Sequence, residues 1–356
     1  MRRLTVVSVA YPLAPVGPDA VGGSEQVLTA IDQALAQAGH RSIVVAMAGS
    51  EAAGELVGYE APPDGQPITD AIVQARRHLV DATLRRVLAE EHVDVVHMHG
   101  LDFHHYLPPP GPAVLATLHL PPDWYPARAY EMDRPNTWLN CVSADEASHT
   151  WPNPRMLPPI GNGVPVERLA AVQVSKRSYA LMLARVCPEK GLHLALQAAL
   201  AADQPLLIGG AIFPYAAHQD YFEQEVAPLL DARRRYLGPL PFLRKRRLLA
   251  GARCLLIPSL VAETSSLVAM EAATCGTPVI AFRSGALPEV VQDGRTGFVV
   301  DDVAGMTDAL GRIGTIDPEE CRQAARDRFT LGRMTDAYLA RYAELAAPQA
   351  AMTKAA

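Results

Sequence analysis

Short runs of apolar residues alternate with longer segments of helical periodicity along this chain, and the alternation occurs in two successive blocks. In the first block, residues 4–10, 41–47, 93–98 and 113–118 are short and rich in β-branched side chains, which predicts strands. Residues 24–38 and 69–91 carry apolar residues at helical spacing, and Thr69 can cap the second of these helices. Strands that alternate with helices favour a parallel sheet with crossover helices.

The same alternation resumes after residue 178. Strands are predicted at 179–184, 205–208, 254–257 and 278–281, and helices at 192–202, 266–275 and 305–313. Pro158, Pro159, Gly161 and Gly163 break regular structure between the two blocks. We therefore expect an α/β fold of two Rossmann-like, doubly wound domains, at 1–165 and 166–330, facing each other across a ligand cleft. A last helix at 331–345 is expected to pack back on the first domain.

Composition narrows the class of protein. The chain is 49% hydrophobic and 20% charged, which suits packed cores, and its net charge of −6 argues against a nucleic-acid binder. It has no run of 18 apolar residues, and its apolar start at 4–10 is interrupted by Tyr11 and Pro12, so a buried strand is favoured over a signal peptide. Five widely spaced cysteines fit reduced thiols and a cytoplasmic protein better than a disulfide framework or a zinc motif.

The segment from Pro258 to Glu271 is the most informative for chemistry. A strand ends near Pro258, and Ser265 or Ser266 can cap the helix that follows, leaving backbone N–H groups there free to bind phosphate. Glu263 lies before the helix and Glu271 two turns inside it, so the two carboxylates suit the hydroxyls of two different sugars. The alternative is an ordinary capped helix with a surface glutamate.

Two further turns could meet an anion. Arg185 and Lys190 flank a Pro/Gly turn between a predicted strand and helix, where both cations can reach one anion. Gly22 and Gly23 open the first predicted helix, where a backbone without side chains allows a ligand to approach closely. Solvated surface cations and an ordinary helix start are the alternatives. The glycine fingerprints GxGxxG and GxxxxGK[ST] are absent from the sequence, so dinucleotide and P-loop sites lack support.

Taken together, these segments resemble the retaining glycosyltransferases of family 4, which have the GT-B fold. The signature of two glutamates separated by seven residues stands here as Glu263 and Glu271. Around it the chain reads CGTPVIA at 275–281, GALPEV at 285–290 and DGRTGF at 293–298. The Arg185–Lys190 turn, GNGV at 161–164 and the Gly22-Gly23 loop follow the same order. The resemblance covers nearly the whole chain and is strongest over 179–300.

The resemblance implies roles for individual residues. Arg185 and Lys190 would hold the donor diphosphate, Glu271 the ribose, and Glu263 the hydroxyls of the transferred sugar. His119 matches the histidine that family members place near the reacting sugar. Other implied donor contacts are Gly22, Gly23, Leu240, Ser265, Ser266 and Leu267. Two departures bear on sugar identity: Thr264, Ser265 and Ser266 replace the common Pro-Phe-Gly, and Ala184 replaces the usual glycine before the arginine.

These roles predict retaining transfer of a hexosyl group from a nucleotide sugar. A UDP-hexose is the first expectation for the donor and GDP-mannose the second, and the acceptor could be a lipid-linked glycan, a small metabolite or a natural product. The sequence contains no Asp-x-Asp motif, so we expect no metal and no cofactor. Alternatives are a non-catalytic nucleotide-sugar-binding protein, a nucleotide-sugar epimerase and, without its glycine fingerprint, a nicotinamide oxidoreductase.

The resemblance assigns no role to the histidine-rich stretch or to the basic runs of the sequence. His97, His99, His104 and His105 form a histidine-rich stretch that could hold a metal. Because His97 and His99 are expected at a strand end beside the cleft, contact with substrate is favoured over a metal site. The basic runs at 233–235 and 244–247 are expected to be solvated surface, with docking to anionic lipid at the inner face of the membrane as the alternative.

Overall fold

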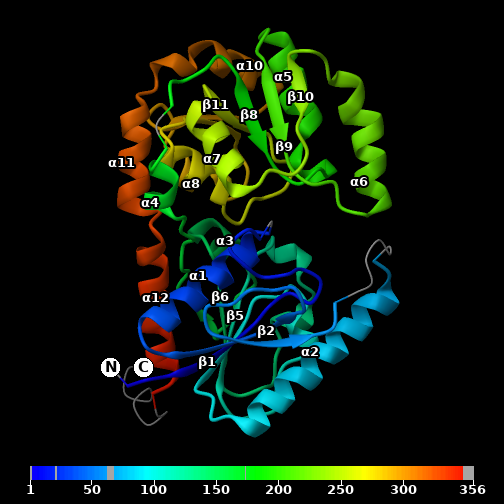
Figure 1. The fold of residues 1–356 in the computed structure, drawn as a ribbon, viewed down its shortest axis with the longest axis vertical. Coiled ribbons are helices and arrows are strands. Elements are labelled where there is room, and N and C mark those ends of the chain that lie inside the picture. The colour runs from blue at the N-terminus through cyan, green and yellow to red at the C-terminus, as the bar shows by residue number, and fades with distance from the viewer. Residues whose placement is uncertain (1, 21, 62–67, 173, 348–356) are drawn as a thin grey trace. The chain divides into compact units, whose positions relative to one another are not determined.

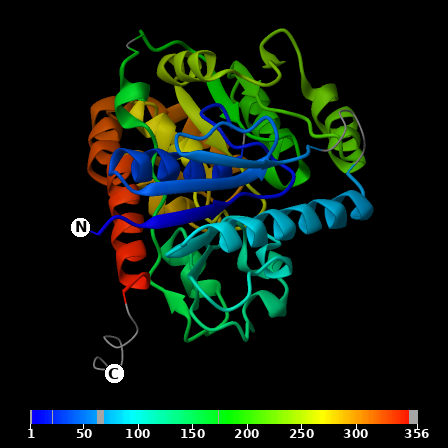
Figure 2. The ribbon, with the colours of Figure 1, turned by 60° about the horizontal axis from the view of Figure 1, so that its bottom comes forward.

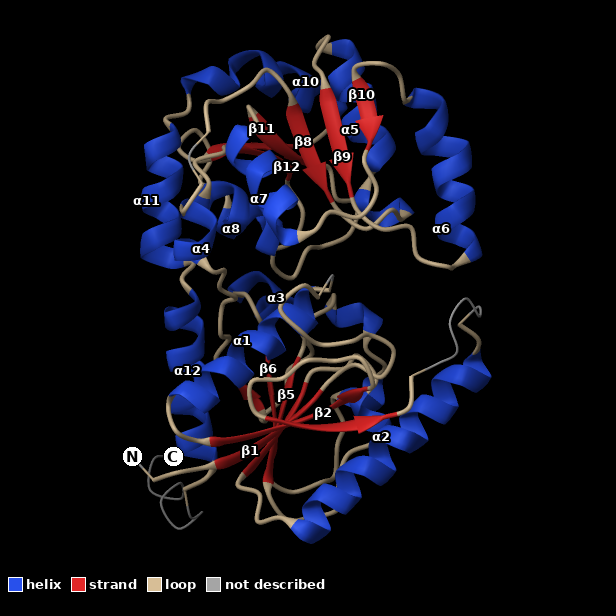
Figure 3. Cartoon of the chain, viewed as in Figure 1, coloured by secondary structure: helices blue, strands red, loops and turns tan. Residues whose placement is uncertain are grey.

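The structure is a computed structural model that describes residues 2–20, 22–61, 68–172 and 174–347. The chain divides into two compact units (Figure 1). The first unit comprises residues 1–161 and 332–356, and the second comprises residues 162–331. Each unit contains one sheet, and each is described by itself below (Figure 3).

The first unit is built on a seven-stranded parallel sheet in the order β3-β2-β1-β4-β5-β6-β7. Its strands are β1 Thr5–Val9, β2 Arg41–Met47, β3 Glu55–Tyr59, β4 Val95–Met98, β5 Ala113–Thr117, β6 Thr137–Asn140 and β7 Met156–Leu157. Its helices are α1 Gly23–Gln37, α2 Asp70–Glu90, α3 Ala144–His149 and α12 Leu331–Leu345.

The central strands are apolar at successive positions, so both faces of this sheet carry side chains that are buried. In β2, Ile43 and Val45 belong to one buried cluster, while Val44 and Ala46 belong to another that includes Leu28 of α1. A strand whose side chains are buried on both sides reads as a continuous apolar run, which is why β2 could be predicted with its observed limits.

The second unit is built on a six-stranded parallel sheet in the order β10-β9-β8-β11-β12-β13. Its strands are β8 Ala180–Leu183, β9 Leu206–Gly209, β10 Arg234–Tyr236, β11 Cys254–Ile257, β12 Val279–Phe282 and β13 Gly297–Val300. Its helices are α4 Val166–Ala170, α5 Leu192–Ala201, α6 Ala216–Tyr221, α7 Phe242–Gly251, α8 Leu267–Thr274, α9 Leu287–Val290, α10 Val303–Arg312 and α11 Pro318–Arg328. Strand order in both sheets confirms the expected α/β class of two doubly wound domains.

The limits of the units show how the ends of the chain are used. The boundary observed after Gly161 lies a few residues before the division expected after Pro165. The last helix, α12, drawn in red in Figure 2, returns to the first unit. There its Tyr342 hydroxyl lies 2.6 Å from His97 Nδ1. Tyr338 and Tyr342 are fully buried there, so this unit is assembled from both ends of the sequence.

Several elements were not predicted because they lack the short apolar runs, or the apolar residues at helical spacing, on which the prediction was based. The strands β3 and β10 lie at sheet edges and are partly polar, and β10 is an Arg-Arg-Tyr run. The helices α7 and α11 are rich in charged residues. The five cysteines are buried and free, as expected for thiols. Among the described residues, no helix combines the length and apolar character needed to cross a membrane.

Candidate active site

A glycine brings together the two most informative segments of the second unit. Lys190 ends a short 3-10 turn, Pro188–Lys190, that follows β8, and Gly191 joins this turn to α5 in the left-handed conformation, with φ of +64°. A Cβ atom added to Gly191 would lie 2.2 Å from the carbonyl oxygen of Pro258. Only glycine fits this close approach. The turn after β8 therefore packs directly against the segment that leads from β11 to α8.

Lys190 and Glu263 meet across this contact. Lys190 Nζ donates to Glu263 Oε1 at 2.5 Å, and Ser259 Oγ donates to the same oxygen at 2.6 Å. Lys190 keeps 24% and Glu263 14% of its side-chain surface exposed, so the pair remains accessible to a ligand. Ser259 was absent from the predicted site, because a serine after a strand carries no distinctive signal in a single sequence.

The backbone around Glu263 is held by the glycine-containing loop at 284–286. Ala286 N donates to the carbonyl oxygen of Glu263 at 2.7 Å, and Ser284 Oγ donates to that of Val261 at 2.6 Å. Gly285 adopts φ of +53°, and a Cβ atom there would lie 2.3 Å from the Glu263 carbonyl oxygen. The run at 285–290 thus has a physical task, which is to position the first glutamate of the signature.

The second glutamate of the signature has its own lysine. Glu271, within α8, is 3% exposed, and Lys245 Nζ of α7 donates to its Oε1 at 2.6 Å. Lys245 belongs to the basic run expected to be solvated surface, so that expectation was wrong for this residue. Arg234 corrects the other basic run, because it is 6% exposed and paired with Asp231. Sequence reasoning missed Lys245 because helical spacing alone did not show that it faces α8.

The start of α8 matches the expected anion site in part. Ser266 occupies the N-cap position, but its side chain makes no capping hydrogen bond, so the serine-capped helix of the prediction is corrected. Its carbonyl oxygen accepts from Ala269 N and Met270 N, which are the first helical hydrogen bonds. Ser266 is buried and Leu267 is half-buried. A helix start whose side chains leave the backbone N–H groups uncapped is suited to an anionic ligand.

Two other predicted donor residues lie at the carboxyl ends of neighbouring strands. The Arg185 guanidinium, just after β8, lies over the Phe213 ring at 5.6 Å, while Lys190 is paired with Glu263. Leu240 packs beside Gly209 at the end of β9, where an added Cβ atom would lie 2.3 Å from Leu240 Cδ1. The structure therefore does not show the two cations meeting at one point, although both come from the same turn.

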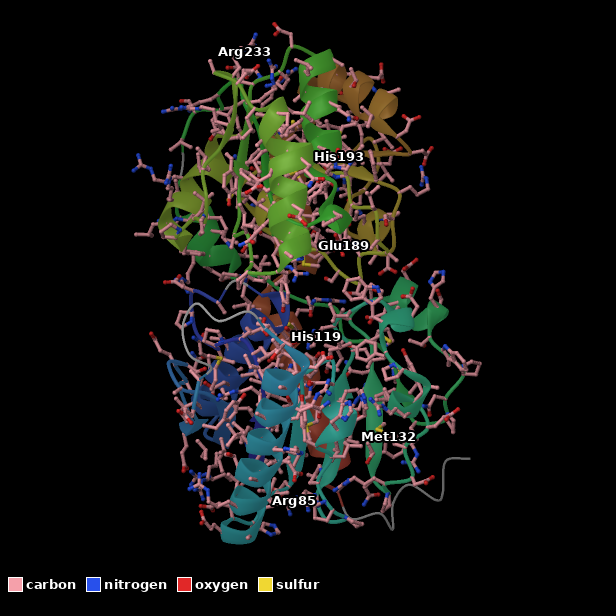
Figure 4. The ribbon with its side chains drawn as sticks, turned by 90° about the vertical axis from the view of Figure 1, so that its right-hand side faces the viewer. Arg85, His119, Met132, Glu189, His193 and Arg233 are labelled. Atoms are coloured by element: carbon pink, nitrogen blue, oxygen red, sulfur yellow. The ribbon has the colours of Figure 1, made fainter. Side chains whose placement is uncertain are left out.

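In the first unit, His119 forms a hydrogen-bonded pair with another histidine (Figure 4). It follows β5, and its Nε2 lies 3.1 Å from Nδ1 of His99, which follows β4. Burial lowers the pKa of His119 to about 4, and burial lowers the pKa of His99 as well, so both rings are neutral at pH 7. His99 was singled out as a strand-end residue expected to contact substrate, and its pairing with His119, which adjacent strand ends bring about, was not predicted.

His97 corrects the expectation that the strand-end histidines contact substrate. It is completely buried, and both of its ring nitrogens are used inside the unit: Nδ1 lies 2.6 Å from the Tyr342 hydroxyl and Nε2 lies 2.7 Å from Thr117 Oγ1. Thr117 Oγ1 in turn donates to Asn140 Oδ1 at 2.7 Å. His97 therefore ties α12 to the sheet.

The paired glycines of the first loop lie at the start of α1. Gly22 is the N-cap residue and Gly23 the first helical residue. A Cβ atom added to Gly22 would lie 1.8 Å from Glu25 Oε2, so any larger residue there would require this carboxylate to move. Glu25 is 5% exposed and was not predicted. Close approach at Gly22 is thus explained by a side chain of the protein itself.

Comparisons with known proteins agree with these features. Residues 21–148 match the family described as Glycosyltransferase Family 4, and residues 177–315 match the family described as Glycosyl transferases group 1. The D-inositol 3-phosphate glycosyltransferase of Corynebacterium efficiens is 38% identical over 119 residues. That stretch covers 33% of this chain and 27% of the relative, so the chain matches about a quarter of that protein's length.

Solved structures share the fold over nearly the whole chain. AviGT4, a glycosyltransferase involved in avilamycin A biosynthesis, matches with a TM-score of 0.71 and 24% identity, over 96% of this chain and 98% of that one. Anabaena HepE in complex with UDP-glucose matches with a TM-score of 0.75 and 17% identity, over 96% of this chain and all of the other. These structures and the two doubly wound sheets show the GT-B fold, and the two family matches, which together span most of the chain, show that it belongs to glycosyltransferase family 4.

Proposed function

We propose that this protein transfers a hexosyl group from a nucleotide-diphosphate sugar to an acceptor hydroxyl, with retention of configuration and without a divalent metal. The observation that carries the proposal is the Lys190–Glu263 pair, in which a cation and a carboxylate share one accessible site beside the start of α8. A donor offers both a diphosphate and sugar hydroxyls. One cation and one carboxylate side by side suit these two chemistries.

The roles of the side chains follow from their charges. Lys190 and Arg185 would bind the diphosphate, and Glu263 would accept hydrogen bonds from hydroxyls of the transferred sugar. Glu271, which is paired with Lys245, would accept hydrogen bonds from the ribose hydroxyls. His119, neutral at pH 7, would hydrogen-bond the transferred sugar, and His99 would fix which of its ring nitrogens carries the proton.

Cleavage of the donor places negative charge on the leaving diphosphate. Lys190, Arg185 and the N-terminus of α8 would stabilise this charge, since fixed donors aimed at a developing charge need no reorganisation during the reaction. The absence of an Asp-x-Asp motif from the sequence supports transfer without a metal at the diphosphate. We favour same-face attack, in which the leaving phosphate oxygen takes the acceptor's proton, over a covalent intermediate on a carboxylate.

We take UDP-hexose as the donor, with GDP-mannose second, and Leu240 beside Gly209 as part of the surface that meets the base. HepE, solved in complex with UDP-glucose, shares the fold, which is compatible with such a donor. A nucleotide-sugar-binding protein without turnover, and an epimerase, are the competing functions. Release of free sugar from the donor without acceptor would exclude the first, and conversion of the donor into its epimer would identify the second.

Thermal-shift screening of UDP-, GDP- and ADP-sugars identifies the donor, because a ligand bound only by the native state raises the melting temperature. Donor cleavage is then measured in buffers without Mg²⁺ or Mn²⁺. We expect Lys190→Ala and Arg185→Ala to lower turnover by about 100-fold or more, the size seen when a charge-stabilising donor is removed.

Arg283→Ala is the matched control, since Arg283 lies in the same unit and forms an exposed pair with Asp301. It should retain full turnover. Near-normal turnover of both the Lys190 and Arg185 variants, or a strict need for added Mg²⁺, would overturn the proposed roles.

A further inference from the structure

Three side chains that metals favour converge beside the turn that carries Lys190. Among the described residues, Cys187, Glu189 and His218 are the group whose ligand atoms could hold one ion, with all three atoms within 4.8 Å of one another. Cys187 and Glu189 come from the turn after β8, and His218 comes from α6. Figure 4 labels Glu189 just before α5. The ligands thus join two segments that are separate in sequence.

Two of the ligand groups have polar atoms that nothing else satisfies. Oε2 of Glu189 and Nδ1 of His218 are both buried at the atom level and have no hydrogen-bond partner within the described structure. A buried polar atom without a partner costs about 1–3 kcal/mol, so two that converge call for a shared ligand. Cys187 is 1% exposed, and its Sγ lies 3.8 Å from the carbonyl oxygen of Arg185, a weak contact.

The donor set selects the kind of ion. One thiolate, one imidazole and one carboxylate are the ligands of Zn²⁺, whereas Mg²⁺ and Ca²⁺ prefer oxygen alone. Around tetrahedral zinc, neighbouring ligand atoms lie about 3.5 Å apart, as follows from bonds of about 2.0–2.3 Å. In the structure the three ligand atoms lie within 4.8 Å of one another, so small side-chain movements would bring them to that spacing around the ion. A fourth position remains for water.

The surroundings link this cluster to the candidate donor site. The ring of Phe213 stacks on His218 with centroids 6.4 Å apart, and the Arg185 guanidinium lies over the same Phe213 ring. Arg185 is positive and opposes a nearby cation. Because zinc binds cysteine as the thiolate, the Cys187 thiol would lose its proton on binding, and with the Glu189 carboxylate it would then supply two negative charges. An ion bound here would brace the turn from which Arg185 and Lys190 both project.

We propose that Cys187, Glu189 and His218 bind one Zn²⁺ that braces the donor-binding turn without contacting the donor. The zinc site itself stands on these three side chains alone, whereas the bracing role rests on the proposed function. This metal is distinct from a divalent ion on the diphosphate, so it is compatible with transfer in the absence of Mg²⁺ or Mn²⁺.

The test uses the full chain, stripped with a chelator and dialysed against Zn²⁺, with bound zinc measured by elemental mass spectrometry. We expect about one equivalent per chain, and binding weaker by at least about 10-fold in Cys187→Ser, His218→Gln and Glu189→Gln. Cys321→Ser and His193→Gln are matched controls in the same unit and should bind as the parent does. Substitution with Co²⁺ should give a thiolate charge-transfer band that is lost only in the Cys187 variant.

Zinc binding no tighter in the parent than in Cys187→Ser, with both folded by circular dichroism, would overturn the site. A cobalt band that persists in Cys187→Ser would do the same. For the bracing role the probe is UDP: zinc should tighten its binding several-fold in the parent and leave His218→Gln unaffected. Equal UDP affinity with and without zinc would refute bracing, while a chain that binds zinc but turns over no nucleotide sugar would refute only the proposed function.

Discussion

At the scale of single residues, each carboxylate of the signature is matched by one lysine. Lys190 pairs with Glu263 and Lys245 pairs with Glu271, so two of the four lysines in an arginine-rich sequence serve these two glutamates. A lysine carries a compact charge on a flexible stem and can leave one partner for another. Lys190 can therefore exchange Glu263 for a phosphate, whereas an arginine fork would be harder to release.

The Lys245–Glu271 pair gives the first prediction. Lys245→Met should lower the free energy of unfolding by about 2–4 kcal/mol, because it leaves the buried carboxylate of Glu271 without its partner. This loss is slightly smaller than that for a fully buried pair, because the Lys245 side chain is 20% exposed. The double variant Lys245→Met, Glu271→Gln should recover most of the loss. Urea denaturation measures both, and a single variant as stable as the parent would contradict the argument.

The buried histidines predict a pH dependence of stability. Burial lowers the pKa of His119 from 6.5 to about 4. Between these two pH values His119 is protonated in the unfolded chain but stays neutral in the folded chain. The contribution of His119 to the free energy of unfolding is therefore complete above pH 6.5 and decreases as the pH drops toward 4. At pH 4.5 the decrease is about 2–3 kcal/mol. His119→Gln should lose that much less than the parent between pH 7 and 4.5 in chemical denaturation. Parallel losses in the two proteins would contradict the assignment.

At the scale of elements, glycines in the connecting turns decide which segments can touch. Gly191 and Gly285 both have positive φ, and both abut backbone atoms of the segment from Pro258 to Glu263. The neighbouring helices and strands set the directions in which these turns run, while the two glycines determine how closely the turns approach the segment from Pro258 to Glu263. The candidate site is thus built from turns that only glycine permits.

Gly191→Ala tests this point against a matched control. Gly238 has nearly the same φ, +71°, but open space around its missing side chain, so Gly238→Ala should cost only the conformational strain of about 1–2 kcal/mol. Gly191→Ala should cost at least about 2 kcal/mol more, because its Cβ atom would overlap the Pro258 carbonyl oxygen. It should also weaken donor binding. Equal melting temperatures for the two variants would contradict this, because they would show that the turn at Gly191 can move away from Pro258 at little cost.

Sequence reasoning recovered elements whose pattern is local and lost those set by neighbours. Buried central strands such as β2 and β11 were predicted with the limits observed, as was α12, because continuous apolar runs and helical periodicity are visible in the chain itself. Edge strand β10 was missed, since its register comes from β9 rather than from its own residues.

The same limit applies to the candidate site. Glu263, Glu271 and Lys190 could be singled out from spacing and resemblance. Their partners Ser259 and Lys245 could not, because a pairing across two elements depends on how those elements pack. Arg185 and Lys190 were expected to meet at one anion, but Gly191 and Pro258 direct Lys190 toward Glu263 instead.

At the scale of the whole molecule, the chain enters and leaves the second unit at adjacent points. Val164 N donates to the carbonyl oxygen of Phe329 at 2.8 Å, and Val164 and Thr330 form an isolated parallel bridge. The second unit is therefore continuous in sequence and closed at its own ends. The first unit is interrupted and needs α12, which supplies the buried side chains of Met334, Tyr338 and Tyr342.

This arrangement predicts different behaviour for fragments. Residues 162–331 alone should fold and unfold cooperatively, because their core includes no residue of the other unit. Residues 1–161 alone should melt at a much lower temperature or lack a cooperative transition, since removing α12 uncovers apolar surface and leaves Nδ1 of His97 without its Tyr342 partner. A peptide of residues 331–345 should restore the transition. Circular dichroism with limited proteolysis measures this, and a fully stable 1–161 fragment would contradict it.

The return of α12 to the first unit also has a consequence for synthesis on the ribosome. Residues 1–161 must wait for α12, which is translated later, while residues 162–331 can complete their own core as soon as they emerge. For most of translation the nascent amino-terminal half exposes the surface that Tyr338 and Tyr342 later cover. Chaperone demand in the cell should therefore concentrate on residues 1–161 until α12 has left the ribosome.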